Sequence, residues 1–383
     1  MKKTFGFLSH LDLNLYLFRT PIIKELLKQG HKIYVICPKG DKNQALEDIG
    51  CKVINYEINR QGLNPFKEKI VIDNIYQSIK GLKLDILHTF TAKPNIYGTF
   101  AGRKAKVPIV LNLVEGLGSF YTQNSFKSII IRNIMEQLYK RAFKMSNGCI
   151  FVNNDDPHYM LKKRIIKKDK VKIIKSVGVD TDRFNIDNFS KEEIKKIKNK
   201  NNFSDKLIVL MVARAIWDKG IKEYYEAAKI IKVKYTNVEF VLVGNTDEGN
   251  HTCASVEYLK NGDVKWLGHR DDIVQLTAMS DICVLPSYRE GIPATLMEAS
   301  SMSKPIVTTD TVGCREVVED GYNGFLVEIK NSENLASRIE NLILDEDLRK
   351  KFGQNARMKV EKEFDVNIIV QQYMEYYNKV IHA

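Results

Sequence analysis

The sequence lacks three features that mark other classes of protein. No uninterrupted apolar run approaches the ~20 residues that a membrane-spanning helix needs, and Ser9, His10 and Asp12 interrupt the apolar start. The start therefore predicts a first buried strand rather than a signal peptide. The six cysteines are scattered, without a Cys-x-x-Cys pair, and several lie in apolar runs. This pattern predicts reduced core thiols in a cytoplasmic protein, without disulfides or a zinc site.

The composition is that of a globular protein whose charge is unevenly distributed. The chain has 383 residues, of which 44% are hydrophobic, so it is long enough for two domains. Residues 1–178 contain 31 Lys and Arg against 14 Asp and Glu, a net charge of +17, whereas the remainder contains 28 against 33, a net charge of −5. A basic first domain predicts an anionic partner, for which nucleic acid and a membrane surface are both candidates.

Short apolar runs alternate with amphipathic segments along the chain. This alternation predicts strands followed by helices, and therefore parallel sheets covered on both faces. Strands are expected at residues 4–8, 32–37, 52–56, 85–88, 109–114, 149–152, 207–212, 238–243, 264–267, 282–285 and 305–308, and helices at 16–28, 65–80 and 126–143. We predict two doubly wound α/β domains, residues 1–178 and 179–364, whose ligands lie beyond the carboxyl ends of the strands.

Residues 285–298 combine the end of a strand, a tight loop and the start of a helix. The first N–H groups of a helix lack internal partners, and the helix dipole is positive there, so this junction predicts a phosphate-binding site. The residues expected to form it are Gly291, Ile292, Pro293, Ala294 and Thr295. Glu290 and Glu298 flank the loop, and carboxylates accept hydrogen bonds from sugar hydroxyls rather than binding phosphate. The ligand should therefore carry both phosphate and sugar, although either glutamate by itself could be a solvated charge.

Two cations, Arg214 and Lys219, follow the predicted strand at 207–212. They leave the carboxyl end of that strand, where the topology also places the glutamate loop. Arginine with its forked donors and lysine as a point charge can together neutralise a diphosphate. In another setting, such a pair would face solvent.

Two loops of the first domain are expected near the ligand. The loop after the first strand supplies Ser9, His10 and Asn14, and the loop after the fifth strand supplies Glu115 with Gly116 and Gly118. The two glycines permit a tight backbone that could admit a phosphate, with Lys93 nearby, although a structural turn is an equal alternative. We expect these residues to bind the acceptor.

The segment 126–143 is an amphipathic helix with basic residues among large apolar ones. Lys127, Arg132, Lys140 and Arg141 are the residues expected to contact an anionic lipid surface. The alternative is a helix that packs one face against the core and leaves the other in water.

The motifs resemble those of the retaining glycosyltransferases with the GT-B fold, in the large family four. The resemblance rests on the Glu-x7-Glu pair at Glu290 and Glu298, the Arg-x4-Lys pair at Arg214 and Lys219, and the Gly-Val-Asp run at 178–180. It spans nearly the whole chain. Ser303 stands where the family usually has glycine, and the loop at 9–14 lacks the paired glycines that many relatives carry.

The resemblance implies two Rossmann-like domains facing a cleft, with a final helix at 365–383 returning to the first domain. It implies that Arg214, Lys219 and Glu290 are catalytic. Glu298 would bind the hydroxyl groups of the ribose, and Glu290 would bind the donor sugar. Further donor-binding residues are Gly244, Leu267 and Arg270. Many relatives have a histidine near the sugar, where the corresponding loop here offers Glu115.

Within the family, the likeness favours bacterial enzymes that assemble N-linked protein glycans on a lipid. These imply UDP-N-acetylgalactosamine as donor and undecaprenyl-diphosphate-linked diacetylbacillosamine as acceptor, in an α-1,3 linkage, at the inner face of the cytoplasmic membrane. Another UDP-sugar or another lipid-linked acceptor is the alternative. No cofactor or metal is expected, because the Asp-x-Asp pairs at 180–182 and 345–347 match a linker and a surface helix rather than a metal site.

Two other functions are consistent with part of the sequence. A glycoside hydrolase could use Glu290 and Glu298 as acid and base, but both come from one side of one site rather than from opposite sides of a bond. A non-enzymatic nucleic-acid-binding protein would account for the basic domain but not for the phosphate site in the acidic one. We therefore expect no nucleic-acid partner.

Overall fold

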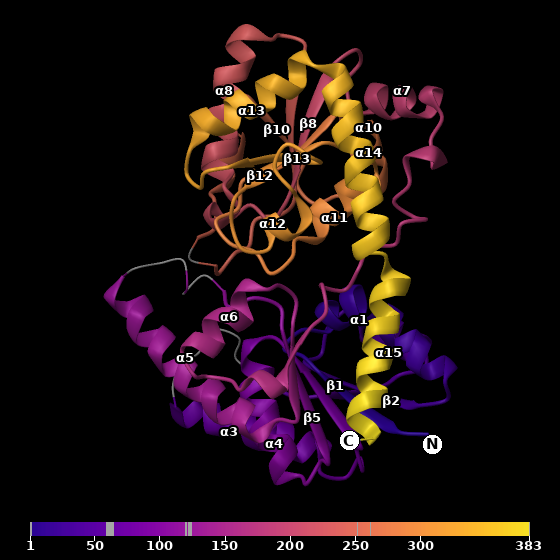
Figure 1. The fold of residues 1–383 in the computed structure, drawn as a ribbon, viewed down its shortest axis with the longest axis vertical. Helices are drawn as coiled ribbons and strands as arrows, with labels where there is room; N and C mark the ends of the chain where they lie inside the picture. The colour runs from indigo at the N-terminus through magenta and orange to yellow at the C-terminus, as the bar shows by residue number, and fades with distance from the viewer. Residues whose placement is uncertain are drawn as a thin grey trace. The chain divides into compact units, whose positions relative to one another are not determined.

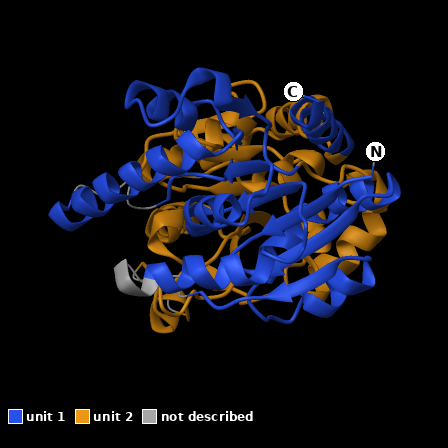
Figure 2. Cartoon of the chain, turned by 90° about the horizontal axis from the view of Figure 1, so that it is seen from below, with its two compact units in different colours: residues 1–177, 367–383 blue, residues 178–366 orange. Residues whose placement is uncertain are grey.

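The computed structural model describes residues 2–58, 65–118, 121, 125–250, 252–260 and 262–382. Its contacts divide the chain into two compact units (Figure 2). Unit 1 comprises residues 1–177 and 367–383, and unit 2 comprises residues 178–366. Residues 119 and 120, in the loop after the fifth strand, lie outside the described residues.

Unit 1 contains a seven-stranded parallel sheet in the order β3-β2-β1-β4-β5-β6-β7. Its strands are β1 (Thr4–Leu8), β2 (Lys32–Cys37), β3 (Lys52–Asn55), β4 (Ile86–Phe90), β5 (Ile109–Val114), β6 (Gly148–Phe151) and β7 (Val171–Ile173). Its helices are α1 (Asp12–Lys28), α2 (Asn43–Asp48), α3 (Pro65–Ile79), α4 (Thr99–Lys104), α5 (Phe126–Met145), α6 (Asp155–Lys162) and α15 (Val366–His382), with the π-helical turn η1 (Pro94–Gly98) before α4. Helices cover both faces of this sheet (Figure 1).

Unit 2 contains a six-stranded parallel sheet in the order β10-β9-β8-β11-β12-β13. Its strands are β8 (Leu207–Val212), β9 (Val238–Val243), β10 (Val264–Trp266), β11 (Ile282–Leu285), β12 (Ile306–Thr309) and β13 (Gly324–Val327). Its helices are α7 (Lys191–Lys200), α8 (Ile221–Lys234), α9 (Val256–Lys260), α10 (Ile273–Met279), α11 (Ala294–Ser301), α12 (Cys314–Val317), α13 (Ser332–Leu344) and α14 (Glu346–Glu363). The turn η5 (Trp217–Lys219) precedes α8.

The predicted α/β class is confirmed, and the expected strands all form with small shifts at their ends. The structure adds β7 and β13, which are only 3 and 4 residues long and half-buried in part. Helix α1 begins at Asp12 rather than at residue 16, so Asn14 lies on the helix and not in a loop. Asp12 places a negative charge in the first turn, which the helix dipole favours, and its carboxylate also accepts a hydrogen bond from the backbone N–H of Lys42 at 2.7 Å.

The final helix α15 packs against the first sheet through aromatic side chains. Residues 367–383 belong to unit 1, and Tyr373 and Tyr377 are buried there. The hydroxyl of Tyr377 is 2.7 Å from Nδ1 of His88, which lies within β4. Burial holds the pKa of His88 well below its usual value, so this histidine is a neutral core residue.

All six cysteines are free, and five of them are buried. Burial raises the pKa of the Cys51 thiol to about 12. These groups act as small apolar side chains.

Candidate active site

In unit 2, the order of the strands reverses between β8 and β11. These two strands are neighbours in the sheet, yet β9 and β10 lie on one side and β12 and β13 on the other. In doubly wound sheets, ligands bind at the carboxyl ends of the strands at this position. The loop after β8 carries Arg214 and Lys219, and the loop after β11 carries Glu290, so the structure brings the predicted catalytic residues to one position.

Lys219 and Glu290 form an ion pair between these two loops. Nζ of Lys219 donates a hydrogen bond to Oε1 of Glu290, and both side chains are largely buried. The backbone keeps the loops together as well, because the carbonyl of Asp218 accepts from N–H of Tyr288 at 2.9 Å and from Oγ of Ser287 at 3.1 Å. The pair is therefore fixed by the fold.

Two glycines allow the loops to approach one another. Gly220 has φ +78°, and a Cβ there would lie 2.1 Å from the carbonyl oxygen of Pro286. Gly313 has φ +84°, and a Cβ there would lie 2.4 Å from the carbonyl oxygen of Gly291. Only glycine fits such a close backbone approach at positive φ. These contacts position the loop that contains Glu290 from both sides.

Arg214 pairs with a residue that the sequence did not single out. Its Nη1 donates to Oδ2 of Asp247 at 2.5 Å, in the loop after β9, and the arginine side chain is otherwise exposed. Asn250 donates to the same Asp247 oxygen at 3.2 Å. Because a guanidinium has five N–H donors, one bond to Asp247 leaves others for a ligand. Asp247 thus orients Arg214 without occupying it.

Gly244 and Leu267, two of the predicted donor-binding residues, lie at adjacent strand ends. Gly244 follows β9, has φ +142°, and donates its N–H to the carbonyl of Gly268 at 2.8 Å. N–H of Leu267 is bonded to the carbonyl of Leu242 at 2.9 Å, which continues the β9–β10 pairing. Arg270 instead makes two hydrogen bonds to Asp272, at 2.7 and 2.5 Å. Its charge is neutralised locally.

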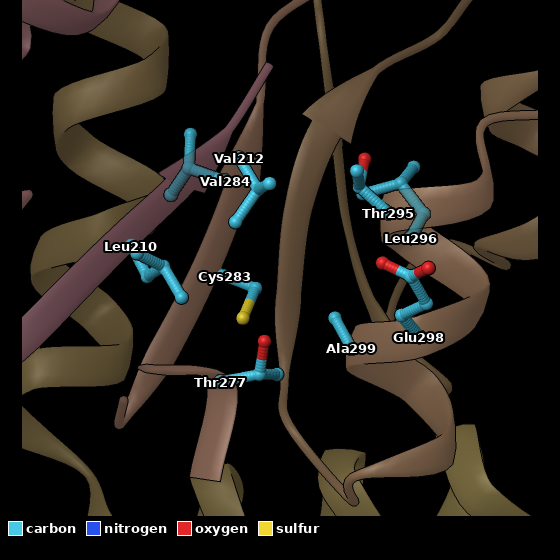
Figure 3. Close-up of a pocket in the computed structure, with 9 residues that line it drawn as sticks. All are labelled: Leu210, Val212, Thr277, Cys283, Val284, Thr295, Leu296, Glu298 and Ala299. Atoms are coloured by element: carbon cyan, nitrogen blue, oxygen red, sulfur yellow. The ribbon is translucent and has the colours of Figure 1, made fainter. Parts of the chain in front are cut away.

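Helix α11 begins at Ala294, with Pro293 as its N-cap, as the motif predicts. Glu298 lies on this helix and lines a small cavity of about 10 Å³, roughly the space that one water needs. The other lining residues come from β8, β11, α10 and α11, and Figure 3 shows both carboxyl oxygens of Glu298 on the side of Thr295 and Leu296. Desolvation raises the pKa of Glu298 to about 7, and the positive charge of Arg183 opposes this shift.

In unit 1, most of the predicted acceptor residues gather at the ends of β1, β4 and β5. Oγ of Ser9 is 3.3 Å from Oδ1 of Asn14, whose amide nitrogen is 3.3 and 3.4 Å from the two carboxylate oxygens of Glu115. Nδ1 of His10 is hydrogen-bonded to Oγ1 of Thr91. Gly116 and Gly118 have φ +149° and +82°, so both glycines are required by the backbone of this loop.

Lys93 is held by an acidic partner. Its Nζ lies 2.6 Å from Oε1 of Glu68 on α3, and both side chains are nearly buried. A lysine in such a pair contributes less positive charge to an acceptor diphosphate than the sequence suggested, because the neighbouring carboxylate offsets its field.

The residue that sequence analysis missed in unit 1 is Arg19. Its side chain is wholly buried, and it forms an ion pair with Glu115. Arg19 lies on the apolar stripe of α1 with Leu15, Ile22 and Ile23. A charged residue in the middle of the apolar stripe of a helix is the signal that would have revealed it.

Helix α5 exposes apolar and basic side chains together. Phe126 is 79% exposed and Ile134 is 52% exposed, and Ile130 is also exposed. Their spacing of four residues places these three on one face. Lys127, Lys140 and Arg141 are exposed as well, whereas Arg132 is half-buried with its guanidinium 5.5 Å from the centroid of the Tyr121 ring. In the described part of the chain, no helix is long and apolar enough to cross a membrane.

The two Asp-x-Asp sequences have local roles. Oδ1 of Asp180 accepts from N–H of Arg183 at 2.9 Å, and Asp345 caps α14 by accepting from N–H of Leu348 at 2.8 Å. Within the described ranges, no three His, Cys, Asp or Glu side chains converge as metal ligands.

Comparison with known proteins identifies the family. Residues 192–359 match the family model "Glycosyl transferases group 1", and residues 7–154 match "Glycosyl transferase 4-like". The chain is 42% identical, over 98% of its length and 98% of the relative, to the N,N′-diacetylbacillosaminyl-diphospho-undecaprenol alpha-1,3-N-acetylgalactosaminyltransferase of Campylobacter jejuni. This chain is a family-four glycosyltransferase.

Other relatives of the transferase agree with this assignment. The UDP-Gal:alpha-D-GlcNAc-diphosphoundecaprenol alpha-1,3-galactosyltransferase of Escherichia coli is 27% identical over 80% of this chain and 78% of its own length. The crystal structure of a glycosyltransferase from Rickettsia africae superposes with a TM-score of 0.79, at 25% identity, covering 99% of each chain. The predicted GT-B fold of the transferase is therefore confirmed.

Proposed function

We propose that the transferase moves N-acetylgalactosamine from UDP-N-acetylgalactosamine to undecaprenyl-diphosphate-linked diacetylbacillosamine, forming an α-1,3 linkage with retention of configuration. The observations that support the proposal are the ion pair of Lys219 and Glu290, which joins the loops after β8 and β11, and the 42% identity of the chain to the alpha-1,3-N-acetylgalactosaminyltransferase of Campylobacter jejuni. The wider alternative is another UDP-sugar or another lipid-linked acceptor.

The donor site would act chiefly by stabilising the charge that develops on the UDP leaving group. Arg214, Lys219 and the N-terminus of α11 supply positive charge and N–H donors. Lys219 has three N–H donors, so it can keep Glu290 in position and still bind a phosphate oxygen. Glu298 would accept hydrogen bonds from the ribose, and Glu290 from the donor sugar. With two cations and a helix dipole at the diphosphate, we propose that transfer requires no metal ion or other cofactor.

We propose that unit 1 brings the transferase to the inner leaflet of the cytoplasmic membrane as a peripheral protein. Unit 1 contains 32 Lys and Arg against 15 Asp and Glu, a net charge of +17. On α5 the exposed face has apolar residues in the first half, where they could enter the lipid, and Lys140 and Arg141 in the second half. Each basic residue near an anionic leaflet contributes about 1 kcal/mol. A lipid-linked acceptor lies in that leaflet.

A substrate panel tests the proposed function. UDP-N-acetylgalactosamine, UDP-N-acetylglucosamine, UDP-galactose and UDP-glucose are each offered with undecaprenyl diphosphate carrying diacetylbacillosamine or N-acetylglucosamine. We expect transfer from the first donor to the first acceptor, an α-1,3 product by NMR, and full activity in EDTA. If the protein prefers another donor or acceptor of the panel, the proposed donor or acceptor is wrong. If a divalent ion restores activity to an EDTA-treated protein, the metal-independent mechanism is wrong.

The double variant Arg214→Ala/Lys219→Ala is the negative control for the panel. RNA and duplex DNA in a mobility-shift assay at physiological salt test the nucleic-acid alternative, and we expect no shift.

A further inference from the structure

The guanidinium of Arg19 is in an unusual environment for an arginine. The residue has no solvent-exposed surface, and its guanidinium carbon is 4.6 Å from the centroid of the Phe90 ring. Taking a charge out of water costs several kcal/mol unless a partner of opposite charge accompanies it. In the described part of the chain, the partner of Arg19 is Glu115.

Glu115 differs from Arg19 in that it reaches the surface. Its side chain is 28% exposed, at the end of β5 beside Gly116. Oε1 accepts from Nη2 of Arg19 and, at 3.3 Å, from the amide of Asn14. Among the described residues, Oε2 has one long contact of 3.4 Å with that same amide. A carboxylate oxygen has two lone pairs, so Oε2 retains the capacity to accept a further hydrogen bond from outside the protein.

The surroundings of Arg19 fix its position from two sides. Phe90 stacks on Phe7 at 5.4 Å between ring centroids, which holds the face against which the guanidinium packs. Tyr373 of α15 is close enough for the charges of Arg19 and Glu115 both to influence its pKa, which burial raises to about 12. The guanidinium packs on Phe90 and has no solvent-exposed surface, so the carboxylate is held by a buried cation.

We propose that Arg19 is a positioning residue that fixes Glu115, so that Oε2 of Glu115 accepts a hydrogen bond from a hydroxyl of the acceptor sugar. This inference rests on the proposed transferase function. The arrangement explains why an arginine occupies the apolar stripe of α1, where an aliphatic residue would pack without a desolvation cost.

Three variants and one control test the inference. They are Arg19→Met, Glu115→Gln, the double variant with both changes, and Arg103→Met. Arg103 is a structural arginine of unit 1, with Nε donating to the carbonyl of Met145 at 2.7 Å and Nη1 to that of Val107 at 2.9 Å. Each variant is measured for Tm, for UDP-N-acetylgalactosamine affinity by calorimetry, and for kcat and KM toward the acceptor that the parent uses in the substrate panel.

We expect Glu115→Gln to lower Tm, because it leaves a buried guanidinium without a counter-charge. The double variant should regain most of that Tm, since no buried charge remains. Acceptor kcat/KM should fall about ten- to a hundredfold in all three variants, the effect of losing a hydrogen bond to a charged group. The double variant should lose no more than Glu115→Gln, because the two residues act as a unit. Donor affinity should stay at the parent value, and Arg103→Met should lower Tm without changing acceptor kinetics.

Two outcomes would overturn the inference. If the double variant regains parent kinetics together with its Tm, the pair is only a structural ion pair. If donor affinity falls as much as acceptor kcat/KM, Glu115 binds the donor and not the acceptor. Failure of the proposed function would be visible separately, because the parent itself would then reject the proposed donor or acceptor in the panel.

Discussion

The two units each contain an ion pair at the ends of their central strands, but the pairs are arranged in opposite ways. In unit 2, Lys219 and Arg214 come from a loop, and each is held by a carboxylate, Glu290 or Asp247. In unit 1, the cation Arg19 is wholly buried on a helix, and its partner Glu115 reaches the surface. In the proposed function, the cations of unit 2 would bind the diphosphate of the donor, and the carboxylate of unit 1 would accept hydrogen bonds from the hydroxyl groups of the acceptor.

The comparison also shows that the net charge of a unit does not indicate which unit binds the phosphates of the donor in the proposed function. The proposed diphosphate site lies in unit 2, which has 27 Lys and Arg against 32 Asp and Glu, a net charge of −5. In the proposed function, two cations and a helix terminus would act on the diphosphate at short range, where the Coulomb energy is large. The surplus of +17 on unit 1 lies mostly on its surface, where charge governs association with other surfaces.

The largest effect is expected from removing the cation of the unit 2 pair. Lys219→Ala should lower kcat/KM about 10²–10³-fold, because charge developing on the leaving group loses a preorganised donor. Steady-state kinetics with the donor varied measures this. Lys222→Ala is the matched control, since Lys222 is an exposed lysine on α8 paired with Glu226 at 3.7 Å. An equal loss in both variants would refute the role of Lys219.

The next effect concerns the surface charge of unit 1. The triple variant Lys127→Glu, Lys140→Glu, Arg141→Glu should abolish flotation with anionic liposomes at low salt, because each cation contributes about 1 kcal/mol of binding. It should also raise the acceptor KM and leave UDP affinity unchanged. A control triple, Lys196→Glu, Lys200→Glu and Lys222→Glu on unit 2, carries the same change in net charge. Flotation lost equally in the control would show a general charge effect rather than binding through α5.

The apolar face of α5 can be tested in the same assay. Phe126→Ser with Ile130→Ser should weaken liposome binding at high salt, where charge is screened and the apolar contribution remains. If the variant binds liposomes at high salt as strongly as the parent does, these side chains do not enter the lipid.

A smaller effect is expected from replacing each of the two glutamates of unit 2, Glu290 and Glu298, in turn. Glu298→Ala should weaken UDP binding by about 1.5–3 kcal/mol, the value of a hydrogen bond to a charged group. Glu290→Ala should leave UDP affinity nearly unchanged and lower turnover, because its partner is the sugar. Calorimetry with UDP and kinetics with the full donor measure the two quantities, and the reverse pattern would exchange the roles.

The smallest effect is a dependence on pH. Glu298 has its pKa raised from 4.5 to about 7 by desolvation, so the folded chain keeps a proton that the unfolded chain releases between these values. Stability should therefore decrease as pH rises through this window. Donor affinity should increase as pH rises, because an ionised carboxylate can accept hydrogen bonds from both ribose hydroxyl groups and the protonated acid accepts fewer.

Calorimetry with UDP-N-acetylgalactosamine checks this dependence. Its diphosphate is esterified at both ends and keeps its charge over the range. Affinity should rise up to about tenfold between about pH 6 and pH 8 for the parent, and stay level for Glu298→Gln. A level profile in the parent would show that the ionisation of Glu298 does not govern donor binding.

Much of the fold could be predicted from the sequence, and so could one part of the candidate site, the strand–loop–helix junction at residues 285–298. Apolar runs such as Leu207–Val212 are buried on both faces of a parallel sheet, so their composition marks them as strands. Short or half-buried strands such as Val171–Ile173 do not carry that pattern, which is why β7 was missed. Most of the proposed donor residues lie within two contiguous motifs, at 214–219 and 290–298, whereas Gly244, Leu267 and Arg270 lie outside them.

The sequence by itself determined the α/β class, the strand–loop–helix junction at residues 285–298 and the unequal charge of the two units, because each depends on neighbours along the chain. The tertiary structure alone decided which charges meet. Arg19 and Glu115 are 96 residues apart, and Lys219 and Glu290 are 71 residues apart. Lys219 and Glu290 meet because parallel strands bring their carboxyl ends to one edge of a sheet, whereas Arg19 reaches the end of β5 from the middle of helix α1. Whether a charge is buried there, as Arg19 is, depends on packing from every side, and no local pattern contains that information.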